Sequence, residues 1–249
     1  MPDNSEDKPA SGAAKLPVKW IVLGVVAIAF MLIFRSQLGG LLERTSDLKI
    51  TTEGVVLKAE VKTVETPLGK TEVSAVPVVK TPQTITGVRG TTYVDMERGF
   101  QISWPNDRDW TADQNVGKQL LRQMGAPATV DIPIAILSNT LIDNFRPNVN
   151  VVVEKVGQTS IQDYVALNKQ NLVAQGWEVL SASVDPETRG GVIVLISNMS
   201  GTKLYQFQRY AVNNGNAYVV TASQIPQSNL NQGLKQDLAD IINSFRIIQ

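Results

Sequence analysis

The chain has 249 residues, of which 43% are hydrophobic and 18% charged, a composition typical of one or two globular domains. Basic and acidic residues are equal in number at 23 each, so the chain offers no positive field for nucleic acid. Cysteine and histidine are both absent from the sequence. Their absence excludes disulfides, thiolate nucleophiles and a lipoprotein cysteine, and it removes the commonest general base and metal ligand.

Residues 1–15 are polar and without periodicity, which predicts a disordered tail. An apolar run from Trp20 to Phe34 follows, and Leu16 and Leu38 extend it. As a helix, residues 16–38 would span roughly 34 Å, enough for a hydrocarbon core of about 30 Å. We therefore expect one transmembrane helix over residues 16–38.

A cleaved signal peptide is the alternative interpretation of this run, with Lys15 and Lys19 as its basic start. No small-x-small cleavage site follows Phe34, which favours an uncleaved anchor. Three basic residues lie close to the run on each side, so the positive-inside rule favours neither orientation.

Residues 39–62 are expected to form an amphipathic juxtamembrane helix and a small β-hairpin that turns at Glu53 and Gly54. Residues 63–91 are rich in threonine, valine and proline. Pro67, Pro77 and Pro82 are spaced so that neither a helix nor a central strand can continue through them. This segment is predicted to be a semi-extended linker.

From residue 92 onward the hydrophobic pattern becomes regular. Apolar or alternating runs predict strands at 100–104, 131–138, 149–156, 177–184, 191–198, 204–212 and 217–223. Helical spacing predicts helices at 115–124, from Ser160 to Gly176, and at 228–244. The asparagine-glycine turn at 213–216 predicts a hairpin. Residues 92–249 are therefore predicted to form an α+β domain, an antiparallel sheet sandwiched by helices.

Several strings in this domain resemble one known family. They are residues 99–105 (GFQISWP) with Trp110, residues 147–153 (PNVNVVV), the helix that opens at Ser160, and residues 241–247 (IINSFRI). Together they resemble the PsbP-like α/β/α sandwich superfamily. This group includes photosystem II PsbP proteins, Ran-binding Mog proteins, and bacterial envelope proteins such as DcrB and LpqN.

The resemblance covers roughly residues 92–249 and implies an accessory or binding module, mostly outside the cytoplasm, with no catalytic residue set to carry over. Bacterial envelope relatives are often lipoproteins, whereas this chain has no cysteine and uses a transmembrane segment instead. We accordingly expect the domain on the extracytoplasmic side, with the cytoplasmic face as the alternative.

Three aspartates could ligate a hard cation: Asp107, Asp109 and Asp113, which surround Trp110. The loop lacks the glycine and final glutamate of an EF-hand, so a solvated turn is favoured, with Asp113 capping the next helix. Residues 185–191 (DPETRGG) carry two acids and an arginine, but they indicate a β-turn rather than acid chemistry or a phosphate loop.

A polar loop at 139–148 is the candidate partner-binding loop, through Asn144, Phe145 and Arg146, because it combines an aromatic side chain with a cation. The alternative is that Phe145 packs inward. Tyr205, Phe207 and Arg209 share one face of a strand and are expected to contact a helix.

Three functions fit these features. The first is a single-pass membrane-anchored, non-catalytic accessory protein whose domain binds another membrane or envelope protein. The second is a carrier or sensor of a small apolar ligand, which requires a large apolar pocket between sheet and helices. The third is a carboxylate-dependent hydrolase, which requires clustered acids with perturbed pKa values.

The expected partners are the bilayer, through residues 16–38, and an unidentified protein; a homo-oligomer stays an open alternative. No nucleic acid, metal, cofactor or catalytic residue is expected.

Overall fold

The computed structural model describes residues 63–66, 69–72, 76–79, 86–123, 126, 128–185, 190–199, 202–226 and 232–248. The tail, the transmembrane helix and the juxtamembrane segment expected within residues 1–62 lie outside this described part. Within it, no helix is both long enough and apolar enough to cross a membrane.

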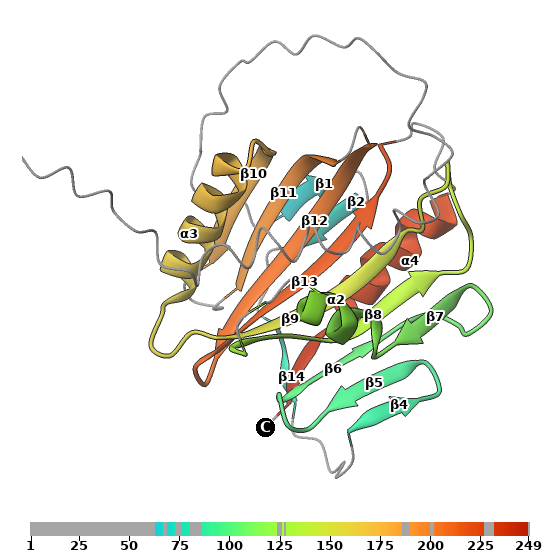
Figure 1. The fold of residues 1–249 in the computed structure, drawn as a ribbon, viewed down its shortest axis with the longest axis horizontal. Coiled ribbons are helices and arrows are strands. Elements are labelled where there is room, and N and C mark those ends of the chain that lie inside the picture. The colour runs from blue at the N-terminus through green and yellow to red at the C-terminus, as the bar shows by residue number, and fades with distance from the viewer. Residues whose placement is uncertain are drawn as a thin grey trace, which may run out of the picture.

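A seven-stranded antiparallel sheet forms the centre of the fold (Figure 1), in the order β10-β11-β12-β13-β9-β8-β7. Its strands are β7 (Trp110–Asp113), β8 (Val130–Ser138), β9 (Asn148–Lys155), β10 (Glu178–Asp185), β11 (Gly190–Met199), β12 (Thr202–Asn213) and β13 (Asn216–Gln224). Six of these seven strands correspond to predicted ones; β7 is too short to show a period. The central strands β8, β9 and β13 are buried along nearly their whole length, as expected for a sheet that is covered on both faces.

A second, five-stranded sheet has the order β3-β14-β6-β5-β4. Its strands are β3 (Val78–Val79), β4 (Gly87–Arg89), β5 (Thr92–Asp95), β6 (Phe100–Ser103) and β14 (Arg246–Ile248). The β14–β3 pair is parallel and the other pairs are antiparallel. Two further strands, β1 (Thr63–Thr66) and β2 (Gly69–Glu72), form a separate hairpin.

The prediction of a linker over 63–91 needs correction, because four strands lie within it and Val76 is buried in the core. The backbone oxygen of Pro77 accepts a hydrogen bond from the Ile247 amide at 3.0 Å. Pro77 directly precedes β3, which is a two-residue edge strand, so the expectation that no central strand continues through this proline holds. The domain therefore begins before residue 92.

Three helices cover the large sheet: α2 (Val116–Gln123), α3 (Ile161–Ala174) and α4 (Gln232–Ser244). In Figure 1, α2 and α3 lie on the near face and α4 lies behind the sheet. Each face has its own core, one beneath α2 and α3 and one shared with α4 and the five-stranded sheet. Along β12, Phe207 points into the second core and Tyr210 into the first. The predicted α+β architecture, antiparallel strands layered with helices, is confirmed; the second sheet is an addition.

Local signals place the ends of α3 and the β12–β13 turn where the sequence predicted them. Ser160 caps α3, and Gly176, at φ 78°, ends it: the Trp177 amide donates to the Leu172 oxygen at 3.1 Å. Asn214 and Gly215, at φ 48° and 74°, form the tight hairpin turn. Asparagine and glycine adopt positive φ values readily, which explains why these residues predicted the hairpin turn and the end of α3 correctly.

Candidate functional site

The three aspartates of the predicted cation loop each make their own local contacts. Asp107 accepts a hydrogen bond from the Trp104 indole at 3.1 Å, and Asp109 pairs with Arg108 at 3.3 Å. Asp113 accepts from the Val116 amide at 3.1 Å, which confirms its predicted role as a helix cap. The described residues contain no cluster of three or more acidic side chains that could hold a metal.

The three residues of the predicted partner-binding loop differ in exposure. Asn144 is exposed and has a left-handed backbone, at φ 61°. Phe145 is buried at 4% exposure, and its backbone exchanges two 2.8 Å hydrogen bonds with Ile142. Phe145 therefore packs inward, the alternative considered above, and it offers no aromatic contact to a partner. Arg146 is half-buried, with its Nε atom enclosed and without a hydrogen-bond partner.

The strand face of Tyr205, Phe207 and Arg209 meets a helix as expected, because Arg209 Nη1 donates to the Ile242 oxygen of α4 at 3.5 Å. Of the 185–191 turn, residues 186–189 lie outside the described part, and Gly190 and Gly191 belong to β11.

Two buried carboxylates bear on the hydrolase hypothesis: Asp95 and Glu154. Asp95 is paired with Arg98 at 3.0 Å and accepts from the Tyr93 hydroxyl at 2.9 Å. Glu154 accepts a hydrogen bond from the Tyr164 hydroxyl at 2.9 Å, and burial raises the pKa of that tyrosine. Both carboxylates therefore have partners that stabilise the folded chain, and neither forms an acid pair of the kind hydrolysis needs.

The feature best suited to binding is an apolar groove between α3 and β10, with a volume of about 630 Å³. Its α3 wall includes Val165, Ala166 and Val173, and its β10 wall includes Ala182 and Val184. Val173 is a large hydrophobic side chain that is nonetheless 54% exposed. An exposed apolar surface of this kind, bordered by polar side chains, is typical of an interaction site.

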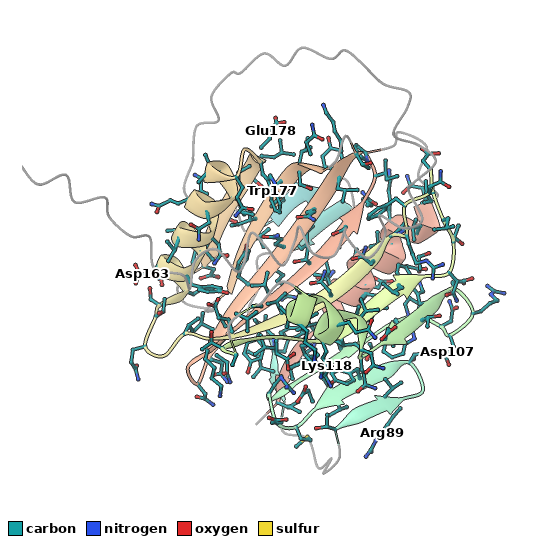
Figure 2. All side chains as sticks on the ribbon, in the orientation of Figure 1. Arg89, Asp107, Lys118, Asp163, Trp177 and Glu178 are labelled. Carbon is teal, nitrogen blue, oxygen red and sulfur yellow. The ribbon has the colours of Figure 1, made fainter. Side chains whose placement is uncertain are left out.

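The polar border of this groove comes from both walls, as Gln162, Lys169 and Gln170 of α3 and Ser183 of β10. Figure 2 labels Asp163 near the start of α3 and Trp177 and Glu178 just past its end. The α3 residues that line the groove run from Gln162 to Ala174, so the groove extends along the helix.

Small residues explain why the groove stays open. Val165 packs closely on β11, because a Cβ atom at Gly191 would lie only 2.7 Å from its Cγ2. The helix therefore approaches β11 closely at Val165, while Ala166, Ala174 and Ala182 line the groove beside β10. Alanine side chains are too short to fill that space.

Sequence reasoning missed this groove. The residues of α3 that the structure buries are Ile161, Tyr164, Val165, Asn168 and Leu172, and Val173 lies outside this buried face. The sequence of α3 has more apolar residues than one buried helix face needs, and Val173 is the last large one of them. This excess could have indicated an exposed apolar surface.

The fold and the groove together define a layered α+β domain with an open apolar groove on one face of its large sheet. No protein-family model matches the chain, and a search of curated proteins also finds no match.

Solved structures with a similar fold include the cyanobacterial PsbP of Synechocystis sp. PCC 6803, with 17% identity and a TM-score of 0.41. That match covers 67% of this chain and 98% of the other. LpqN of Mycobacterium tuberculosis, described as involved in cell envelope biogenesis, has 12% identity and a TM-score of 0.39, over 65% of this chain and 86% of LpqN. Both belong to the PsbP-like group named from the sequence, and the likeness is one of fold alone.

Proposed function

We propose that this chain is a single-pass membrane-anchored accessory protein whose α+β domain binds another membrane or envelope protein in the groove between α3 and β10. The observation that carries the proposal is the groove itself, an apolar surface with Val173 54% exposed. Burying such a surface against a partner stabilises a complex by roughly 25 cal/mol for each Å² removed from water. The anchor is the apolar run over residues 16–38.

The groove favours a protein partner because it is open along its length. Small-molecule sites usually enclose most of their ligand, whereas this groove has walls on two sides only, α3 and β10. Its apolar lining and its volume of about 630 Å³ also suit the second candidate function, carriage of a small apolar ligand such as an acyl chain. The experiment below separates the two.

A photo-crosslinking amino acid at position 173 tests the site in intact membranes. Val88 of β4, which is 41% exposed and is not among the groove residues, is the matched control position. We expect position 173 to capture one defined membrane or envelope protein, and Ala182→Asp, which places a charge in the groove, to abolish that product. Equal capture at both positions would contradict the proposal, and a lipid adduct at position 173 would favour the apolar-ligand carrier.

Protease protection of a C-terminal tag in bacterial spheroplasts tests the topology. An extracytoplasmic domain exposes the tag to digestion, while a cytoplasmic control protein stays intact. Protection of the tag would instead place the domain in the cytoplasm, and partners would then be sought there.

A further inference from the structure

We infer that the partner binds as an extended strand that pairs with the free edge of β10 and directs alternate side chains into the groove. This inference rests on the proposed function of the groove and adds the class of ligand. Within the described part of the chain, β10 pairs with β11 and with no other strand. Among the strands that the structure describes, none pairs with the other side of β10.

Comparison of the edge strands identifies β10 as the longest edge of the two larger sheets in the described part of the chain. Natural sheets shield their edges by short strands, charges, prolines or bulges. The described edges β3, β4 and β7 are two, three and four residues long. By contrast β10 has eight residues, without proline and without charge between Glu178 and Asp185. Its bulge lies near one end, between Val179 and Ser181, so Ser181–Val184 stays regular.

The register of β10 fixes where an added strand would place its side chains. Ala182 and Val184 pair with Ile193 and Gly191 and face α3. Side chains that lie opposite them on a neighbouring strand point to the same face of the sheet. Every second side chain of the added strand would therefore enter the groove beside Val173. The edge of β10 can form hydrogen bonds with the backbone of a ligand, and the groove can accommodate apolar side chains. A strand whose apolar and polar side chains alternate provides both.

The charges of β10 favour a different protein over a second copy of this chain. Glu178 and Asp185 make both ends of the strand acidic. Antiparallel pairing of two β10 strands about their centre would place Glu178 directly opposite Asp185 of the other copy, and like charges in that position are destabilising. A partner strand with lysine or arginine at its ends has the complementary charge. The occupant is therefore an extended, alternating segment of another protein, flanked by basic residues.

The test uses the full chain in lipid nanodiscs and a fluorescent octapeptide that alternates valine and threonine between terminal lysines. Two control peptides keep these side chains but carry N-methyl groups on every second amide, one in each phase. We expect the parent peptide to bind and at least one N-methylated peptide to lose about tenfold or more in affinity, because backbone hydrogen bonds are lost. Glu178→Lys should weaken binding of the lysine-ended peptide severalfold.

Two outcomes would overturn strand addition. One is no binding of the parent peptide; the other is equal affinity for all three peptides, which would show side-chain binding alone. Neither outcome affects the crosslinking result at position 173, so the proposed function can survive the failure of this inference. A dimer in the nanodiscs that Glu178→Lys strengthens would assign the β10 edge to a second copy and would also overturn the inference.

Discussion

Arg98 is the residue on which the junction between the two sheets depends. Its guanidinium contacts Asp95, which is 0% exposed, at 3.0 Å and also pairs with Asp131 at the start of β8. The Tyr218 hydroxyl donates to the Arg98 backbone oxygen at 2.6 Å. A buried carboxylate is tolerated only with such partners, because its desolvation is costly.

Replacement of Arg98 by alanine should therefore be strongly destabilising. Arg98→Ala leaves Asp95 buried without its cation, and we expect a loss of about 2–4 kcal/mol in the free energy of unfolding. Arg108→Ala is the matched control, since Arg108 also pairs with an aspartate but its side chain is 87% exposed, and it should change stability by less than about 0.5 kcal/mol. Urea denaturation followed by circular dichroism measures both. Similar losses in the two variants would argue against the buried cluster.

Gly117 is the second position where a single residue decides the packing. A Cβ atom there would lie 2.4 Å from the Cβ and the backbone oxygen of Ile132, so α2 can approach β8 only with glycine. Gly117→Ala should cost about 2–3 kcal/mol by overpacking, although alanine is the better helix former. The exposed neighbour in Lys118→Ala should change little. Thermal unfolding compares the two, and an unchanged melting temperature for Gly117→Ala would refute this close packing.

Among the elements, α3 is the one that the sequence specifies most completely. Ser160 Oγ accepts from the Asp163 amide at 3.1 Å, and both residues belong to the helix-start pattern that was readable in advance. Ser160→Ala should reduce stability by about 1 kcal/mol, and Ser160→Thr, which keeps the hydroxyl that accepts from the Asp163 amide and donates to its carboxylate, should recover most of it. Equal unfolding midpoints for the alanine and threonine variants would show that the cap contributes nothing.

Element length explains what could be predicted and what could not. Strands of eight or more residues, such as β8 and β12, carry enough alternation to be recognised, and turn residues mark their ends. β3, β4 and β14 have two or three residues, so they show no period. β3 and β14 form by pairing between distant segments, whereas β4 pairs with the neighbouring β5.

The groove was unpredictable for a related reason. The groove is formed by α3 and β10 together, and the close approach of Val165 of α3 to the sheet requires Gly191, which is distant in the sequence. The Asp113 cap, in contrast, spans three residues and was predicted correctly. Local contacts are readable from sequence, whereas the site arises from contacts between distant elements.

At the scale of the whole molecule, buried tyrosines set the response to alkaline pH. Burial raises the pKa of Tyr93, Tyr164, Tyr210 and Tyr218, whereas an unfolded tyrosine titrates near pH 10. Above about pH 10 the unfolded chain releases protons that the folded chain retains, so the free energy of unfolding should fall as pH rises. Arg209 acts in the opposite sense, because burial lowers its pKa to about 10, but one group opposes four.

The measurement is a pH titration that follows tyrosinate absorbance and circular dichroism together. We expect stability to be unaffected by these tyrosines below about pH 10, and above it their ionisation should coincide with unfolding. In Tyr210→Phe the number of protons released on unfolding should fall by about one. Gradual ionisation of all tyrosines in a fully folded protein would contradict their burial.

The pairing of β14 with β3 and β6 has a consequence for biosynthesis. Ser244 Oγ bonds to the amide and the oxygen of Ser103 at 2.8 Å across 141 residues of sequence, and Phe245 packs on Phe100 with ring centroids 5.5 Å apart. The ribosome must therefore translate nearly the whole described domain before the five-stranded sheet can close. Until β14 has been synthesised, Phe100 and the aromatic residues that contact it lack their packing partner Phe245, and we expect chaperones to bind them. A ribosome that stalls before β14 would therefore carry a chain in which the five-stranded sheet has not formed.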